Sequence, residues 1–336
     1  MGTEGGGRHI SEMFFSGTSS PDPAAARCPR MPFEDAGPFN ESKESKLMKL
    51  EGKVALITGA GSGLGRQSSQ LFAGEGAKIA VVDIDADRAE QTVKLVEQQG
   101  GDAIAITADV ADKSAITAAV DQTVEHYGKL DIAWANAGVV SRGGVPSVAG
   151  GEQVDFEDLT EEDWNNVLGV NLSGVIFTAQ AAVPALKRNG GGTIIATSSA
   201  ASFVAYHQIA LYSATKAGVN GLVRGLSLDL GPYGIRVNGI APVHGMSPNF
   251  LMPAGSPVVG QSYEEVAGPW DPYVSPIPLK RNRPPSLVDN AKIALFLASD
   301  DSAYMSGQVI GSGDGGTLSR VGMWFPEDLD QKNPNA

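Results

Sequence analysis

The chain has 336 residues, of which 42% are hydrophobic, and its 25 basic and 38 acidic side chains give a formal net charge of −13. This length fits one large domain or two small ones, and the acidic balance argues against nucleic-acid binding, which normally uses a basic face. A single cysteine, Cys28, excludes an intrachain disulfide, and the four scattered histidines form no zinc cluster, so we expect no metal. No apolar run approaches the roughly 20 residues of a membrane helix, and the N-terminus lacks an apolar signal core. These features predict a cytoplasmic protein without a membrane partner.

Residues 1–47 differ in composition from the rest of the chain. They contain three consecutive glycines and five prolines and show no periodic pattern, which predicts a disordered N-terminal extension. Because residues 48–53 look like a natural protein start, a mis-assigned start is an alternative interpretation. We expect one catalytic domain over residues 48–320 and a C-terminal tail over residues 321–336.

From Lys53 onward, short apolar runs alternate with helical spacing. The predicted strands are Val54–Thr58, Lys78–Asp83, Ala103–Thr107, Asp131–Ala135, Thr193–Thr197, Ile235–Ile240 and Gln308–Ile310. The predicted helices are a first one that follows a glycine-rich turn and runs through Glu75, then Ala86–Gln99, Lys113–Tyr127, Glu161–Leu186 (interrupted or ended near Pro184), Leu211–Leu230 and Leu287–Ala298. Alternating strands and helices are typical of βαβ units. The sequence therefore predicts an α/β fold, a single doubly wound Rossmann domain with a seven-stranded parallel sheet flanked by helices.

The glycine-rich turn Thr58-Gly-Ala-Gly-Ser-Gly-Leu-Gly65 lies between the first predicted strand and its helix. Glycines allow a tight turn and a close approach of the backbone to a ligand, and the N-terminus of a helix attracts a pyrophosphate. The spacing is G-x-x-x-G-x-G and departs from the strict G-x-G-x-x-G pattern. Its position between a strand and a helix nevertheless favours dinucleotide binding.

Asp83 ends the second predicted strand, 18 residues after Gly65. A carboxylate at this position accepts hydrogen bonds from the ribose hydroxyls of NAD and repels the 2′-phosphate of NADP. The alternative is a cap for the following helix, a role for which Asp85 is better placed. We therefore expect NAD as the cofactor.

Tyr212 and Lys216 are four residues apart on a predicted helix, so their side chains share one face. An unperturbed phenol titrates near pH 10, and a cation fixed beside it favours the phenolate. The pair is thus a candidate proton-transfer group near neutral pH, although Tyr-x-x-x-Lys also arises by chance on helices.

Together with Asn136-Ala137-Gly138 after the fourth predicted strand, these motifs resemble the short-chain dehydrogenase/reductase family over residues 50–318. The resemblance implies a catalytic set of Asn171, Ser199, Tyr212 and Lys216. Tyr212 would exchange a proton with the substrate hydroxyl, and Lys216 would lower its pKa and hold the nicotinamide ribose. Ser199, 13 residues before Tyr212, would bind the substrate oxygen, and Asn171 would hold a relay water. The alternatives are an ordinary strand-edge serine for Ser199 and a helix-kink residue for Asn171.

The resemblance also implies a set of cofactor-binding residues, in which Asp109 and Val110 contact the adenine. After the sixth predicted strand the chain departs from the family pattern. Val243 replaces the usual Gly, Gly245 replaces the usual Val or Ile, and Ser247 replaces the usual Thr. The expected cofactor contacts are Gly59, Gly61, Ser62, Gly63, Leu64, Gly65, Asp83, Ile84, Asp109, Val110, Asn136, Ala137, Gly138, Tyr212, Lys216, Pro242, Gly245 and Ser247.

Two long loops, Val139–Asp158 and Val243–Pro285, are expected to determine the substrate. The second holds nine of the chain's 20 prolines together with several large apolar residues, which favours a lid over a large apolar pocket; a subunit interface is the alternative. Candidate substrate contacts are Ser141, Phe203, His207 and His244, the last with a solvent-facing loop position as its alternative.

The sequence therefore predicts an NAD-dependent oxidoreductase that interconverts a secondary alcohol and a ketone. The substrate is expected to be ring-containing and hydrophobic, such as a steroid, a terpenoid, or an aromatic-derived alcohol or dihydrodiol, and the family implies a homodimer or homotetramer. Two alternatives are a non-catalytic NAD-binding protein and an NADPH-linked reductase of acyl chains.

Overall fold

The computed structural model describes residues 48–140, 154–204, 206, 209–245, 247, 270–272, 275 and 277–319, all within one compact unit, Leu47–Ala336. The expected N-terminal extension, Ser141, His207, most of the predicted 243–285 lid and the whole predicted 321–336 tail lie outside the described residues.

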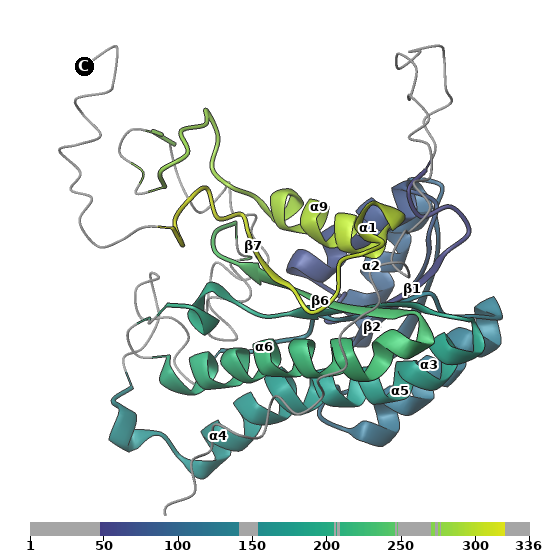
Figure 1. Ribbon diagram of the computed structural model, residues 1–336, viewed down its shortest axis with the longest axis horizontal. Coiled ribbons are helices and arrows are strands. Elements are labelled where there is room, and N and C mark those ends of the chain that lie inside the picture. Colours follow the sequence, from purple (N-terminus) through teal and green to yellow (C-terminus); the bar gives the residue numbers. More distant parts are fainter. Residues whose placement is uncertain are drawn as a thin grey trace, which may run out of the picture. The chain divides into compact units, whose positions relative to one another are not determined.

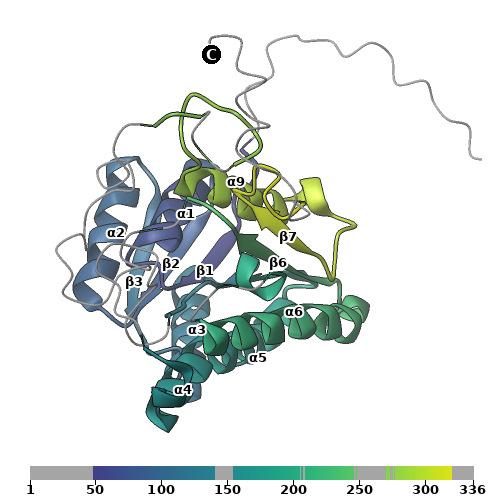
Figure 2. The same ribbon diagram turned by 90° about the vertical axis from the view of Figure 1, so that its left-hand side faces the viewer.

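The described residues form one sheet of seven parallel strands in the order β3-β2-β1-β4-β5-β6-β7. Figure 2 shows β3 at one edge of the sheet and β7 at the other. The chain reverses direction across the sheet between β1 and β4, which is where ligands bind in doubly wound folds. The predicted fold is confirmed. The strands are β1 Val54–Thr58, β2 Lys78–Asp83, β3 Asp102–Thr107, β4 Ile132–Ala135, β5 Gly192–Thr197, β6 Ile235–Pro242 and β7 Val309–Ser312.

Helices cover both faces of the sheet (Figure 1), with α1, α2 and α9 on one side and α3, α5 and α6 on the other. The α-helices are α1 Gly63–Gly74, α2 Ala86–Gln98, α3 Lys113–Tyr127, α4 Glu161–Leu168, α5 Gly174–Arg188, α6 Ala210–Leu230 and α9 Leu287–Ala298. Short 3₁₀ turns lie at Phe156–Asp158, Ala200–Ser202, Gly231–Tyr233 and Asp300–Ser302.

Each strand supplies alternate side chains to two separate cores. In β1, Ala55 and Ile57 pack with Phe72 of α1, whereas Val54 and Leu56 pack in the core on the α3 and α5 side. The five residues of β1 are all buried, as expected for a central strand that is covered on both faces.

The predicted helix Glu161–Leu186 is divided, but not at Pro184. A π-helical turn, Gly169–Ser173, separates α4 from α5, and α5 continues through Pro184 to Arg188. Pro184 and Gln180 are both exposed, so the carbonyl that loses its N–H donor lies on the solvent side of the helix, where water is available to it. The prediction of a break near Pro184 is therefore wrong.

The combined helix Glu161–Arg188 is long and apolar enough in composition to cross a membrane, although no such segment was expected. Its apolar character has a local explanation, because Val175, Ala179, Ala182 and Leu186 pack in the cores beside β4 and β5.

Candidate active site

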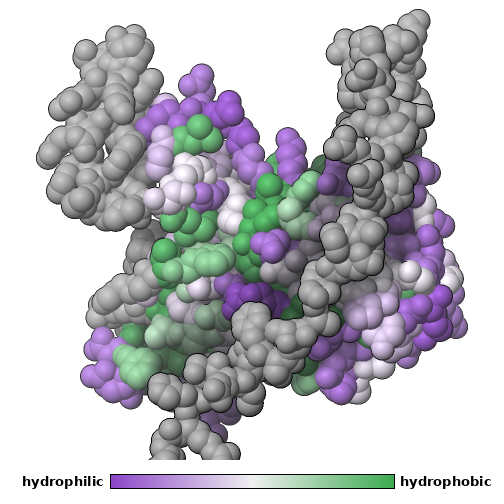
Figure 3. All heavy atoms as spheres, in the orientation of Figure 1, coloured by the Kyte–Doolittle hydropathy of each residue, from purple (hydrophilic) through white to green (hydrophobic). Residues whose placement is uncertain are grey.

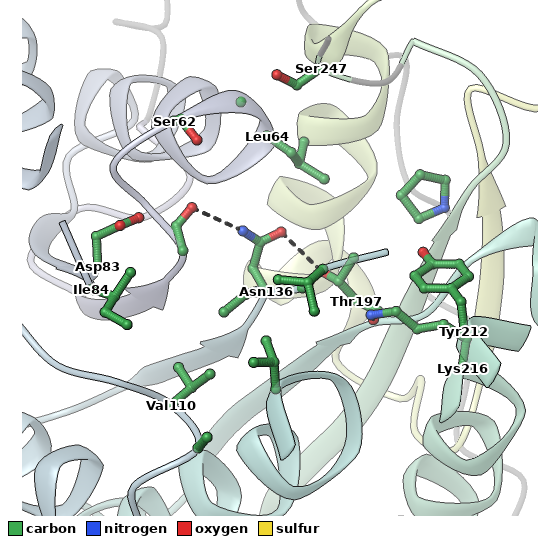
Figure 4. A pocket seen from close by; sticks show the side chains of 18 of the residues that line it. Ser62, Leu64, Asp83, Ile84, Val110, Asn136, Thr197, Tyr212, Lys216 and Ser247 are labelled. Carbon is green, nitrogen blue, oxygen red and sulfur yellow. Dashed lines mark hydrogen bonds between the residues drawn. The ribbon is translucent and has the colours of Figure 1, made fainter. Parts of the chain in front are cut away.

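A cavity of about 470 Å³ lies at the carboxyl ends of the strands. Figure 4 shows Asp83 and Ile84 at one end of it and Tyr212 and Lys216 at the other, with Asn136 between them. Most of the predicted cofactor contacts line this cavity, namely Gly59, Ser62, Gly63, Leu64, Asp83, Ile84, Asp109, Val110, Asn136, Ala137, Gly138, Tyr212, Lys216, Pro242, Gly245 and Ser247.

The glycine-rich turn leaves the N-terminus of α1 open to a ligand. Gly59 and Gly63 adopt left-handed φ angles of 62° and 50°, which favour glycine. A side chain at Gly65 would place its Cβ 2.4 Å from the Gly59 carbonyl oxygen, so helix and turn pack too closely for any other residue. Ser62 is the N-cap of α1 but its side chain makes no capping bond. The first-turn N–H groups can therefore bind an anion, and the turn fits a dinucleotide pyrophosphate.

Asp83 is held rigidly at the end of β2. Its Oδ2 accepts a hydrogen bond from the Gly61 N–H (2.8 Å), and its Oδ1 accepts one from the Asp85 N–H (3.1 Å). Asp85 is the residue that caps α2, where its side chain accepts from the Arg88 N–H. The capping alternative thus applies to Asp85, and the Asp83 carboxylate remains at the cavity wall.

Asn136 ties together the carboxyl ends of three strands. Its Nδ2 donates to the Thr58 carbonyl of β1 (3.0 Å), and its Oδ1 accepts from the Thr197 hydroxyl of β5 (3.1 Å). Trp134 of β4 donates its indole N–H to the same Thr197 hydroxyl (2.9 Å). This network fixes the floor of the cavity between the glycine-rich turn and Lys216 (Figure 4).

Tyr212 and Lys216 lie on α6 and are both almost completely buried, at 3% and 1% exposure. The Lys216 Nζ donates to the Thr197 carbonyl (2.8 Å) and lies 5.7 Å from the centre of the Tyr212 ring. The helix thus places both groups on one face, as predicted from their spacing.

The protonation of this pair differs from the sequence-based expectation. Burial raises the pKa of Tyr212 to about 12, although a hydrogen bond with Ser199 opposes the shift. Burial lowers the pKa of Lys216 to about 7. Loss of hydration disfavours the charged form of both groups in the cofactor-free protein, and the lowering of the Tyr212 pKa by Lys216 stays a prediction.

Asn171 lies in the π-helical turn and is fully buried. Its Oδ1 accepts from the Val139 N–H (2.9 Å), and its Nδ2 donates to the Val139 carbonyl (2.8 Å). A weaker contact joins Nδ2 to the Thr215 hydroxyl of α6 (3.4 Å). Asn171 therefore anchors the chain that leaves β4, and π-turns of this kind are frequent at functional sites.

Ser199 follows β5 and caps the 3₁₀ turn Ala200–Ser202, where its hydroxyl accepts from the Ala201 N–H (3.2 Å). Its neighbour Ser198 lines the cavity and donates to the Asn220 Oδ1 of α6 (2.6 Å). These bonds fix the end of β5 against the helix that carries Tyr212.

The loop after β6 explains one departure from the family pattern. Gly245 has a left-handed φ of 69°, and a Cβ there would lie 2.7 Å from the backbone of Ser286. A Cβ on Gly63 would lie 3.0 Å from the Ser247 Cβ, so the loop reaches the glycine-rich turn. A branched residue at position 245 would not fit this path.

The candidate substrate contacts are only partly described. The Phe203 side chain is half exposed, and neither it nor His244 belongs to the described cavity wall. His244 bonds through its Nε2 to the Thr317 hydroxyl (2.8 Å), and burial lowers its pKa. His244 is thus packed against Thr317 in the C-terminal part of the described chain. The alternative interpretation, a solvent-facing loop position, does not describe it.

The cavity also contains residues that sequence reasoning missed. Ala108 and Ala111 flank the predicted adenine contacts, and this adjacency could have indicated them. The remaining lining residues come from other helices, loops and strand ends, and the motifs do not mark them: Arg88, Val139, Asn165, Asn166, Gly169, Val170, Thr197, Ser198, Leu287 and Asn290. The part of the chain that the structure describes contains no cluster of His, Cys, Asp and Glu that could hold a metal.

Residues 53–249 match the sequence model of a family described as short chain dehydrogenase. The (−)-trans-carveol dehydrogenase of Rhodococcus erythropolis is 37% identical over 292 residues, which cover 81% of this chain and 100% of the relative. A 3-oxoacyl-acyl-carrier-protein reductase of Thermotoga maritima is 35% identical over 271 residues, which cover 81% of this chain and 100% of that protein.

A solved structure of a 7α-hydroxysteroid dehydrogenase, in complex with NADH and 7-oxo glycochenodeoxycholic acid, superimposes with a TM-score of 0.65 at 30% identity. The match covers 82% of this chain and 98% of that protein.

Proposed function

The chain belongs to the short-chain dehydrogenase family, an oxidoreductase family that binds a nicotinamide cofactor, and we propose that it interconverts a secondary alcohol and a ketone with NAD(H). One observation carries the proposal. A single cavity is lined at one end by a glycine-rich turn with Asp83 and at the other by Tyr212 and Lys216.

In this proposal a bound nicotinamide cofactor would supply hydride transfer, and the protein's own residues move the proton. The Tyr212 hydroxyl exchanges a proton with the substrate oxygen, and the Ser199 hydroxyl hydrogen-bonds the same oxygen as charge develops on it. An amine with a pKa of about 7 can accept a proton at neutral pH, so protonation of Lys216 can balance ionisation of Tyr212. The resulting ammonium then favours the phenolate. Asn171, through Val139, keeps the wall beside this pair in place, and its relay role stays a prediction.

The preference for NAD over NADP is proposed from Asp83. Its carboxylate is fixed by two backbone N–H groups at the cavity wall, where it can still accept bonds from ribose hydroxyls. A 2′-phosphate at the same place would meet a negative charge.

A bulky, hydrophobic, cyclic alcohol is the proposed substrate. Phe203, Val204 and Tyr206, which follow Ser199, expose large apolar surfaces. Figure 3 shows hydrophobic residues gathered in the left half of the described surface, whereas hydrophilic ones predominate on the right. The names of two relatives, a carveol dehydrogenase and a hydroxysteroid dehydrogenase, point to the same class. Cytoplasmic location, a homodimeric or homotetrameric state and the absence of nucleic-acid or membrane partners stay predictions.

The similarity to a 3-oxoacyl-acyl-carrier-protein reductase favours a second candidate, an NADPH-linked acyl-chain ketoreductase. A panel of terpenoid, steroid and dihydrodiol alcohols with NAD or NADP, alongside a 3-oxoacyl thioester with NADPH or NADH, separates the two. We expect NADH formation with a cyclic alcohol. Turnover of the thioester alone, with NADPH, would overturn the proposal.

Tyr212→Phe should reduce kcat on the active alcohol by at least about 100-fold, because it removes the proton-transfer group. Tyr233→Phe is the matched control, since Tyr233 lies half exposed just beyond the other end of α6. Equal rates in wild type and Tyr212→Phe would exclude Tyr212 from the mechanism. Cofactor binding without turnover of any compound, in any variant, would favour the non-catalytic alternative.

A further inference from the structure

Asn290 is a fully buried polar residue in the first turn of α9, and it lines the candidate cofactor cavity. It lies far along the chain from the motifs of the site. The proposed reaction does not use Asn290, and its hydrogen bonds indicate a structural role at the cavity.

The Asn290 amide is bonded at one end only. Its Nδ2 donates to the His244 carbonyl (2.9 Å) and contacts the Gly245 carbonyl (3.3 Å). Because two carbonyl oxygens face this end, it must be the NH₂ group, and Oδ1 is therefore the other end. Oδ1 is buried and has no hydrogen-bond partner among the described residues. A buried, unsatisfied acceptor is unfavourable in a protein interior, and the bonds of the NH₂ end offset this cost.

The carbonyls that Asn290 holds belong to the loop that leaves β6. Gly245 of this loop has a left-handed φ of 69° and packs against the Ser286 backbone. Pro242, Gly245 and Ser247 all line the cavity, and Ser247 reaches the glycine-rich turn at Gly63. The Asn290 amide therefore fixes the path of the loop across the cavity.

The position of this loop in the sheet relates it to one half of a dinucleotide. Strand β6 lies on the β4–β5 side of the sheet, away from β2 and Asp83. In a doubly wound fold the two halves of a dinucleotide occupy opposite sides of the switch point, and Asp83 marks the ribose of the adenine half. The loop after β6 thus leaves its strand on the nicotinamide side of the switch point, where β6 also packs against α6, the helix of Tyr212 and Lys216.

We propose that Asn290 is a positioning residue, which fixes the His244–Gly245 backbone so that the loop after β6 receives the nicotinamide half of the cofactor. The proposal rests on the proposed function. It predicts that loss of the amide weakens binding of the nicotinamide half and leaves the adenine half unaffected.

The test compares the dissociation constants of NADH and AMP by calorimetry in wild type, Asn290→Asp and Asn290→Leu. Asp has the same shape but presents oxygens to two carbonyl groups, and Leu has a similar size but no donor. We expect the Kd for NADH to rise about tenfold or more in both variants, and the Kd for AMP to stay within about twofold. Asn290→Ser is a third variant with a smaller side chain, and the same two dissociation constants are compared in it. One of the three variants that folds is enough for the test.

Asn238→Asp is the matched control. Asn238 is also fully buried and also clamps backbone, since its Nδ2 donates to the Met305 carbonyl (2.7 Å) and its Oδ1 accepts from the Gln308 N–H (3.1 Å). It does not belong to the cavity wall. We expect a lower melting temperature in this variant, with both dissociation constants within about twofold of wild type.

Three results would overturn the inference. They are an unchanged Kd for NADH in the Asn290 variants, an equal loss of NADH and AMP binding, and the same selective loss in Asn238→Asp. A wild-type protein that binds neither NADH nor NADPH would instead overturn the proposed function, and the inference with it.

Discussion

Replacing Lys216 with methionine should flatten the dependence of stability on pH in the cofactor-free protein. Burial lowers the pKa of Lys216 to about 7, whereas a lysine in the unfolded chain titrates near 10.4. Between these values the unfolded chain binds a proton that the folded protein has released. The free energy of unfolding must therefore rise with pH across this window, and methionine has no proton to contribute.

The magnitude follows from the size of the pKa difference. One proton bound only in the unfolded state gives a slope of at most about 1.4 kcal/mol per pH unit. Between about pH 7.5 and 9.5, wild type should gain about 2 kcal/mol relative to Lys216→Met. Above about pH 10 the free energy of unfolding should fall with pH in both proteins, because a tyrosine in the unfolded chain ionises there while burial keeps the Tyr212 phenol protonated. The difference between wild type and Lys216→Met should level off in that range.

Urea unfolding at the two pH values, with wild type and variant measured in parallel, gives this difference. Loss of the bond to Thr197 adds an offset that does not change with pH, and other titrating groups are common to both proteins. Lys94→Met is the control, since Lys94 is exposed on α2 and should leave the slope unchanged. A wild-type-minus-variant difference that changes by less than about 0.5 kcal/mol between the two pH values would refute the reasoning.

Gly65→Ala should destabilise the protein by more than about 2 kcal/mol in a urea melt, because its Cβ would lie 2.4 Å from a backbone carbonyl oxygen. In contrast, Gly74→Ala at the end of the same helix meets nothing within 4 Å and should be neutral or stabilising; equal effects would contradict the close packing. Asp83→Asn should improve the Kd for NADP relative to that for NAD about tenfold, since it removes the charge that opposes a 2′-phosphate, and an unchanged ratio would remove Asp83 as the determinant. Asn136→Leu should lower stability by about 2 kcal/mol through loss of its bonds to the ends of β1 and β5, measured by denaturant unfolding; a loss below about 0.5 kcal/mol would show that the network is not needed.

Local patterns predicted much of this molecule. Strands β1 and β2 and helices α3 and α9 match their predicted bounds, and β3 and β5 begin one residue earlier than predicted. The agreement arises because buried parallel strands and amphipathic helices have strong sequence patterns. The pairing of Tyr212 with Lys216 followed from helical spacing alone.

Other features depend on how deeply a side chain is buried and on contacts between segments far apart in sequence, and no local pattern reveals either. The raised pKa of Tyr212 and the lowered pKa of Lys216 were not predicted, because spacing gives the proximity of the two groups but not their burial. Asn290 could not be found, because its role arises only when α9 packs beside the loop after β6. His244 was expected either at a ligand or in solvent, but it bonds Thr317, about 70 residues away in sequence.

The π-helical turn at Gly169–Ser173 amounts to one extra residue inserted in an otherwise continuous helix. Because the wider π turn takes up that residue within a single turn, α4 and α5 keep the relative rotation of one continuous helix. Deleting one residue of this turn would convert it to an α turn and leave the side chains of α4, including Asn165 and Asn166 of the cavity wall, facing as they do now. A deletion within α4 itself would instead rotate the residues before it by about 100°. The change at the π turn would therefore be local, and it would fall on the buried Asn171.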